Sequence, residues 1–140
     1  MNLSISQSYL LCVLKDDGTI SKLGLDDNWL IAAGMLDLIL NRIIENNNNK
    51  ILVIKELPQN LNYLELLYKF FESSNKNTKL SILEFSTKDV GKSKNLLFKS
   101  IAKSLEKIGA VNSIPKSNIF GEYEAFIPNN KHLNLIIEHI

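Results

Sequence analysis

The sequence has 140 residues, 45% hydrophobic and 22% charged, a balance typical of one globular domain, so we expect a single domain over residues 1–140. A net charge of +1 indicates no strong overall attraction to anions. The longest apolar stretch, Trp29 to Leu40, falls short of the about 20 residues that a membrane-spanning helix needs, and no secretory signal pattern is visible. We therefore expect neither a membrane span nor export.

The cysteine content indicates the cellular compartment, and the charge distribution shows which part of the chain is basic. Cys12 is the only cysteine, so no internal disulfide can form, and its apolar neighbours predict a small core residue. A chain without disulfides is typical of the reducing cytoplasm. Residues 1–49 carry six acids and three bases, whereas residues 88–116 carry seven lysines, one Asp and one Glu. The later segment is therefore the basic part of the chain.

The first third of the chain predicts two helices. Ser4 or Ser6 can cap a short buried helix that includes residues 9–14, and Asp16-Asp17-Gly18 then predicts a turn. The next helix, expected over residues 28–44, is apolar almost all round. A helix of that kind is usually buried, so we expect it to run through the middle of the core.

The middle of the chain alternates between polar and apolar segments. Asn46 to Asn49 favours a polar loop, and Ile51 to Ile54 is the best short strand. A broad helical stripe follows over residues 63–71, closed by polar residues, and residues 80–85 favour a further short helix.

The clearest amphipathic helix is predicted from about Lys92 to Ile108, with Gly109 ending it. Residues 119–127 favour a hairpin around Gly121 and Glu122, and residues 133–140 a last helix. The expected fold class is mainly α, with a central apolar helix and a small β-hairpin. The apolar positions that define the amphipathic helix are Leu97, Ile101, Leu105 and Ile108.

Motifs for catalysis are missing from the sequence. It has no glycine-rich phosphate loop, no paired cysteines at zinc spacing and no serine nucleophile elbow, so we predict a non-enzymatic protein without a cofactor. His132 and His139 could share a helix face, but two histidines rarely hold a metal alone. The aspartate pairs at 16–17 and 26–27 are better explained by turn and cap chemistry.

A row of lysines is the best candidate site. Lys99, Lys103 and Lys107 recur every four residues and form a ridge along one side of the amphipathic helix. Such a ridge is commonly no more than a solvated face, but it also suits an anionic membrane surface. A second candidate is the apolar part of the expected hairpin, which could touch lipid. Its residues are Ile119, Phe120, Phe126 and Ile127.

The order of these motifs resembles the Golgi phosphoprotein 3 family, over nearly the whole chain. The local pattern closest to the family is the helix that ends in a glycine and two apolar residues. The segments that carry the resemblance are Leu3-Ser4, Tyr9 to Leu11, Asp16 to Ile20, Ala32 to Leu38, Arg42-Ile43, Ile51 to Ile54, Pro58, Leu64-Glu65 and Ile101 to Val111.

The resemblance implies a mostly helical, non-catalytic peripheral membrane adaptor that binds phosphatidylinositol 4-phosphate and protein tails. It also implies that the C-terminus of this chain is shortened. The positions matching the family's head-group residues hold Leu23, Ala32, Asn95 and Phe98, which offer no cationic fork for a phosphate. We therefore expect weak binding to anionic lipid through charge, without selection of one head group.

Two other functions stay open. A basic helix followed by a hairpin is also the order of a winged-helix nucleic-acid binder, although the near-neutral net charge disfavours nucleic acid. A protein-interaction domain, including a homo-oligomer, is the other alternative.

Overall fold

The computed structural model describes residues 2–19, 27–73 and 76–129. Within these ranges the helices are α1 (Ile5–Val13), α2 (Asp27–Leu40), α3 (Glu65–Glu72), α4 (Ser81–Thr87) and α5 (Lys92–Lys107), with 3-10 turns η1 (Gln59–Leu64) and η2 (Lys88–Gly91). The strands are β1 (Ile44–Asn47), β2 (Lys50–Val53), β3 (Lys76–Asn77), β4 (Val111–Asn118) and β5 (Gly121–Pro128).

The fold class is α+β, so the prediction of a mainly α domain is wrong. Helices account for 53% and strands for 23% of the described structure, and the strands form two antiparallel sheets. One sheet has the order β1-β2-β3 and the other is the hairpin β4-β5. In the first sheet the predicted strand at Ile51 to Ile54 corresponds to β2, but its partners β1 and β3 were not predicted because they are short and mostly polar.

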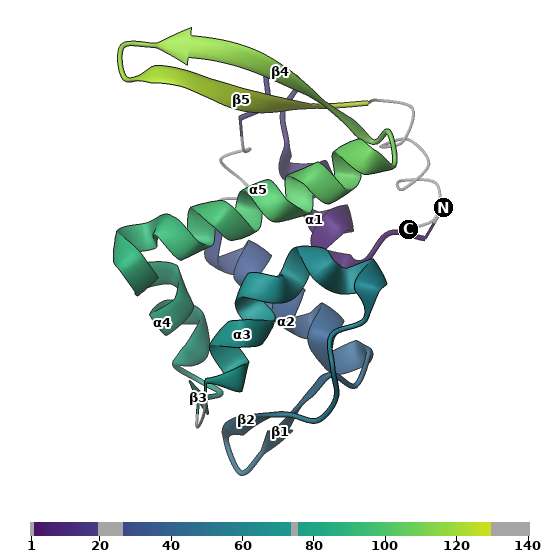
Figure 1. Ribbon diagram of the computed structural model, residues 1–140, viewed down its shortest axis with the longest axis vertical. Helices are drawn as coiled ribbons and strands as arrows, with labels where there is room; N and C mark the ends of the chain where they lie inside the picture. The colour runs from purple at the N-terminus through teal and green to yellow at the C-terminus, as the bar shows by residue number, and fades with distance from the viewer. Residues whose placement is uncertain (1, 20–26, 74–75, 130–140) are drawn as a thin grey trace.

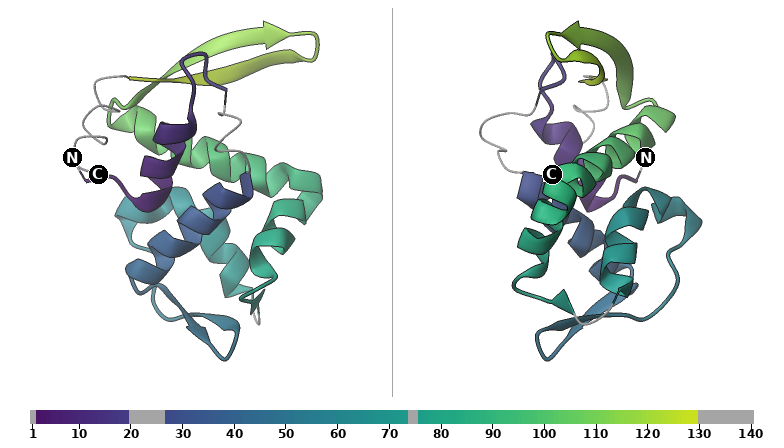
Figure 2. Two further views of the ribbon diagram at one scale, coloured as in Figure 1. Left: turned by 180° about the vertical axis from the view of Figure 1, so that it is seen from behind. Right: turned by 60° about the vertical axis from the view of Figure 1, so that its left-hand side comes forward.

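The helices lie between the two sheets (Figure 1). Helix α5 crosses the front of the molecule, with the β4-β5 hairpin above it and α3 below it, while α1 and α2 lie behind (Figures 1 and 2). The hairpin β1-β2 forms the opposite end. Buried side chains from α1, α2, α3 and α5 form one hydrophobic cluster, to which Phe85 of α4 and Phe126 of β5 also belong.

Helix α1 begins with a capping box and a second, long-range cap. Ser4 Oγ accepts a hydrogen bond from the Gln7 amide (3.3 Å), and Gln7 Oε1 accepts one from the Ser4 amide (3.0 Å). The carboxylate of Asp37, on α2, accepts from the amides of Ile5 (2.7 Å) and Ser6 (2.9 Å) and from Ser6 Oγ (2.5 Å). Asp37 therefore joins two helices by satisfying amides that the first turn leaves free. The outer side of α1 carries Cys12, which is exposed and not a core residue.

Helix α2 is not the central apolar helix that the sequence predicted. It ends at Leu40, because Arg42 has a positive φ of 57° and turns the chain into β1. Its inner side is buried, but Leu36 is 47% and Leu40 68% exposed. Uniform apolarity predicted burial on every side; the structure covers one side only, so the core has no single central helix.

The predicted polar loop at Asn46 to Asn49 is a two-residue hairpin turn. Asn47 pairs with Lys50, and the two turn residues Asn48 and Asn49 both have positive φ angles, 51° and 64°. Consecutive residues with φ above zero are what a type I′ turn requires, and asparagine tolerates that conformation better than most residues. The Asn-Asn pair is therefore a signal for a tight turn and not for a loop.

Helix α5 agrees with its predicted range and ends as expected. Leu97, Ile101 and Leu105 are fully buried, whereas Ile108 is 39% exposed and caps the helix end. Gly109, with φ of 78°, donates to Glu106 O, and the Ala110 amide donates to Leu105 O. This pair of bonds is a Schellman motif, in which a glycine ends a helix at low steric cost.

Residues 133–140, predicted as a last helix, and His132 and His139 lie outside the described residues, as does Leu23.

Candidate functional site

The three lysines of the predicted ridge all lie on the solvent side of α5. Lys99, Lys103 and Lys107 are exposed, while the opposite side of the helix is buried in the core. Lys92, the first residue of α5, is exposed as well and extends the charged side towards the start of the helix. We call these four residues the lysine face.

The lysine face is not neutralised by ion pairs in the described part of the chain. The ion pairs found there use Lys69, Lys76 and Lys88. Glu106 is exposed on α5, but its Oε2 accepts a hydrogen bond from the Ser113 amide (3.1 Å), which directs this carboxylate towards the hairpin. The lysine face can therefore attract an anionic surface.

The tip of the β4-β5 hairpin exposes two large apolar side chains. Strand pairing ends at Asn118 and Gly121, so Ile119 and Phe120 form the turn, two residues earlier than predicted. Asn118 Oδ1 accepts a hydrogen bond from the Phe120 amide (2.8 Å), and Gly121 has a φ of 120°. Asn at the first and Gly at the fourth turn position suit a type I turn. Ile119 is 92% and Phe120 91% exposed.

The other two predicted hairpin contacts face the protein, so this part of the prediction needs correction. Phe126 is 2% exposed, and its ring packs edge-on against Phe98 of α5, with ring centroids 6.3 Å apart. Ile127 is half-buried, and its Cδ1 would lie 3.2 Å from a Cβ added at Gly18. Phe126 and Ile127 therefore fix the base of the hairpin, because one packs on α5 and the other lies close to Gly18.

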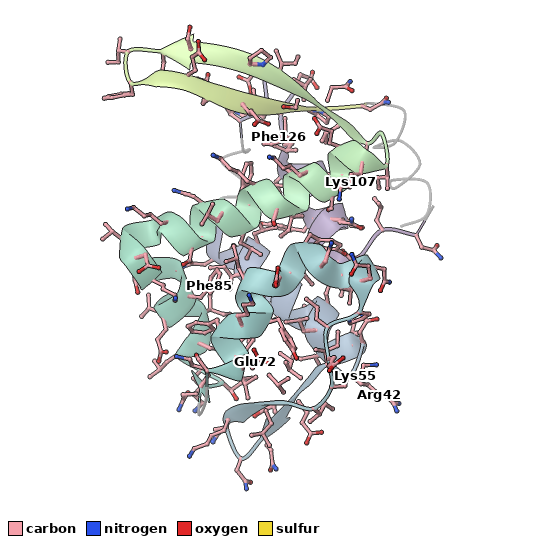
Figure 3. The ribbon with its side chains drawn as sticks, viewed as in Figure 1. Arg42, Lys55, Glu72, Phe85, Lys107 and Phe126 are labelled. Carbon is pink, nitrogen blue, oxygen red and sulfur yellow. The ribbon has the colours of Figure 1, made fainter. Side chains whose placement is uncertain are left out.

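The hairpin tip and the start of α5 lie at the same end of the molecule. In the front view and the view from behind, the turn of the hairpin lies above the first turns of α5, and the hairpin base lies above the last turn (Figures 1 and 2). Lys107 is labelled near that last turn, away from the tip (Figure 3). Lys92 and Lys99 are thus the members of the lysine face nearest the tip in chain order along α5.

The positions that match the family's head-group residues offer no anion-binding fork. Ala32 lies on α2 and Asn95 is exposed on α5, while Phe98 is half-buried under the hairpin. None of the three side chains is cationic, so the described structure adds no replacement for a guanidinium at these positions.

Asp17 stabilises the turn that the sequence predicted at Asp16-Asp17-Gly18. Asp17 Oδ1 accepts hydrogen bonds from Thr19 Oγ1 (2.6 Å) and the Thr19 amide (2.9 Å). These bonds lower the pKa of Asp17 below its ordinary value. In the ranges 2–19, 27–73 and 76–129 no three His, Cys, Asp or Glu side chains lie close enough to hold a metal ion.

One surface depression was not foreseen. It lies between the segment after β2 and α3, with Glu56, Pro58, Glu65 and Tyr68 in its lining. Partial burial, followed by the charges of Glu72 and Glu56, raises the pKa of Tyr68. The sequence signal for it was weak because its residues come from a loop and a helix that look ordinary when taken separately.

Comparison with known proteins returns no matching family model and no matching curated protein. The resemblance to the Golgi phosphoprotein 3 family therefore stays a prediction. In the part of the chain that the structure describes, each helix is too short or too polar to cross a bilayer.

Proposed function

We propose that this protein is a non-catalytic, cytoplasmic domain that attaches peripherally to anionic membranes, as the resemblance to the Golgi phosphoprotein 3 family implies. The observation that carries the proposal is the hairpin tip. Two adjacent large apolar side chains, Ile119 and Phe120, are more than nine-tenths exposed at the end of a projecting hairpin. Water is a poor environment for such a pair, whereas the interfacial region of a bilayer can bury both.

The energetics require the tip and the lysine face together. Burying one large apolar side chain contributes about 1.5–3 kcal/mol, and each lysine close to an acidic surface about 1 kcal/mol. The lysine face alone gives weak attachment, which salt screens over about 8 Å at physiological ionic strength. The tip adds a contribution that salt does not screen. We therefore propose reversible attachment, in which charge brings the protein to the membrane and the tip prolongs its stay.

The protein responds to the total charge of the membrane and does not distinguish one lipid head group from another. Ala32, Asn95 and Phe98 offer no guanidinium to bind one phosphate pattern. Vesicles with phosphatidylserine or phosphatidylinositol 4-phosphate at equal total charge should therefore retain the protein equally. A protein partner recruited to the membrane would make the domain an adaptor.

Vesicle flotation tests the proposal. The wild-type protein should float with phosphatidylcholine vesicles that contain phosphatidylserine, and not with phosphatidylcholine alone. Lys99→Glu/Lys103→Glu/Lys107→Glu should abolish flotation, and Ile119→Ser/Phe120→Ser should reduce it strongly at physiological salt. Lys50→Glu/Lys55→Glu/Lys79→Glu is the matched control, because it changes net charge equally at three exposed lysines outside α5.

Three results would overturn the proposal. The first is equal loss in the control variant, which would mean that only net charge matters. The second is selection of phosphatidylinositol 4-phosphate at matched charge. The third is a wild-type protein that does not bind vesicles but binds a short DNA duplex, with DNA binding lost in the α5 lysine variant. That result would favour the winged-helix alternative, which α5 followed by a hairpin also fits.

A further inference from the structure

The segment that joins α4 to α5 exposes a valine in an unusual backbone conformation. This segment is η2, residues 88–91, and we call it the α4-α5 corner. Asp89, Val90 and Gly91 all have positive φ angles, of 53°, 57° and 82°. Such angles suit glycine, whereas they are rare for a β-branched residue such as valine. Val90 is also 97% exposed, so packing of its side chain does not compensate for the strained backbone.

Asp89 ties the α4-α5 corner to the first turn of α5. Its Oδ2 accepts a hydrogen bond from Ser93 Oγ (3.4 Å) and lies 3.8 Å from Lys88 Nζ, and its backbone carbonyl accepts one from the Lys92 amide. These contacts hold the corner in a shape that directs Val90 into solvent. Strained residues that the surrounding structure holds in place are often found at binding sites, so the corner is a candidate contact.

Val90 shares its high exposure with the hairpin tip. Among the described residues, the large apolar side chains that are more than nine-tenths exposed are Val90, Ile119 and Phe120. The hairpin turn and the α4-α5 corner both reach the left side of the molecule in Figure 1, and both reach the right side when it is seen from behind (Figure 2, left). One flat surface can therefore touch the tip and the corner together.

The charge around the α4-α5 corner is positive. Between Glu84 and Glu106 the sequence contains five lysines and a single acid, Asp89, whose charge Lys88 offsets. Lys88 and Lys92, on either side of Val90, are exposed. Glu122 is an acid near the hairpin turn, so the positive charge at this side comes from the corner and α5. Apolar side chains flanked by lysines suit the interface of an anionic bilayer, where the ammonium groups stay among the head groups.

We propose that Val90 is a second membrane contact, which enters the bilayer interface together with Ile119 and Phe120. This inference rests on the proposed attachment to anionic membranes and adds the orientation of the bound protein. The hairpin tip alone would leave the protein free to pivot on the membrane. A second contact at the α4-α5 corner restricts that motion and brings the first turns of α5, with Lys92, close to the head groups.

Tryptophan reporters in the full-length protein test the orientation. In the Trp29→Phe background, emission of Val90→Trp should shift to the blue on adding phosphatidylserine-containing vesicles at low salt, and brominated acyl chains should quench it. Phe120→Trp should respond in the same way. Leu40→Trp is the matched control, at a 68% exposed site two residues before Arg42, which lies on the other side of the molecule (Figure 3). Its emission should not change.

Variants without a reporter give an independent readout. Val90→Gly should weaken partition into these vesicles about tenfold, because an apolar side chain no longer enters the interface. Its melting temperature should stay the same or rise, since glycine adopts a positive φ at little cost. Val90→Ser should weaken partition similarly, whereas Leu40→Ser should bind like the wild type.

The outcomes separate this inference from the proposed attachment. A shift for Phe120→Trp without one for Val90→Trp, or wild-type partition of Val90→Gly, would overturn the second contact and leave the attachment intact. An equal shift for Leu40→Trp would also overturn it, because the bound protein would have no fixed orientation. A shift of Val90→Trp with protein concentration alone would assign the corner to a protein contact. Failure of the wild type to float would overturn both.

Discussion

Helices α2 and α5 are nearly equal in length, yet their sequences predicted their surroundings with opposite success. In α5 the apolar residues repeat on one side and lysines fill the other, and the structure buries and exposes them accordingly. In α2 apolar residues lie on every side, and the structure leaves Leu36 and Leu40 exposed. An amphipathic pattern states which side faces the core, whereas a uniformly apolar pattern states only that several sides avoid water.

Truncation in the two helices should give the largest contrast. Ile101→Ala, at a fully buried site in α5, should lower the free energy of unfolding by about 2–5 kcal/mol, because it leaves a cavity. Leu36→Ala would cost as much in a helix buried on all sides, as the sequence predicted, but should cost less than about 1 kcal/mol, because nearly half of that side chain is exposed. Urea denaturation measures both. Equal losses of unfolding free energy at Ile101 and Leu36 would indicate that α2 is buried on all sides, as the sequence predicted.

Asp37 sharpens the comparison, because it is a charged side chain that α2 buries. Asp37→Ala removes the acceptor for two backbone amides of α1 and for Ser6 Oγ, so unfolding free energy should fall by about 2–4 kcal/mol. Asp37→Asn keeps one acceptor oxygen, so its unfolding free energy should lie between those of the wild type and Asp37→Ala. Asp16→Ala, in an exposed turn, is the control and should change stability by less than about 0.5 kcal/mol. A neutral result for Asp37→Ala would mean that α1 does not depend on this cap.

The exposed side of α5 should matter for binding and hardly at all for stability. Lys99→Glu/Lys103→Glu/Lys107→Glu should change unfolding free energy by less than about 0.5 kcal/mol, since exposed charges contribute little. Among single variants, Lys99→Glu should weaken vesicle retention more than Lys107→Glu, which lies near the hairpin base (Figure 3). A larger effect at Lys107 would place the membrane at the other end of α5.

The smallest expected effect concerns pH and the turn before α2. Hydrogen bonds from the side chain and amide of Thr19 lower the pKa of Asp17. A lowered folded pKa means that the interaction stabilises the fold above the unfolded value and is lost as pH falls through the folded one. An NMR titration should place the midpoint of Asp17 below that of an unstructured aspartate. A midpoint at the ordinary value would contradict these bonds.

The sequence predicted correctly those features that depend on one helix alone. The range of α5, the glycine that ends it and the cap at Ser4 follow from local chemistry. Strand β2 was predicted, but its partners β1 and β3 were missed because short polar strands carry almost no pattern, although Asn48-Asn49 was a usable turn signal. Phe126 was misplaced because alternation along a strand does not reveal where the hairpin leaves the body of the protein.

The site could be predicted only in part for the same reason. The lysine spacing on α5 was sufficient to place Lys99, Lys103 and Lys107 on one exposed side. The apolar tip depended on register: a turn one residue later would have changed which side chains lie at the end of the hairpin. The role of Asp37 could not be predicted, because its hydrogen-bond partners are 31 and 32 residues away in the sequence.

A tryptophan at the hairpin tip tests the central claim most directly. In Phe120→Trp, with Trp29→Phe to remove the native signal, emission should shift to the blue when phosphatidylserine vesicles are added at low salt. The shift should disappear in the Lys99→Glu/Lys103→Glu/Lys107→Glu background and with phosphatidylcholine alone, because the lysine face must first bring the tip to the bilayer. Unchanged emission while the protein floats with the vesicles would contradict the account, since the membrane would then be bound by another surface.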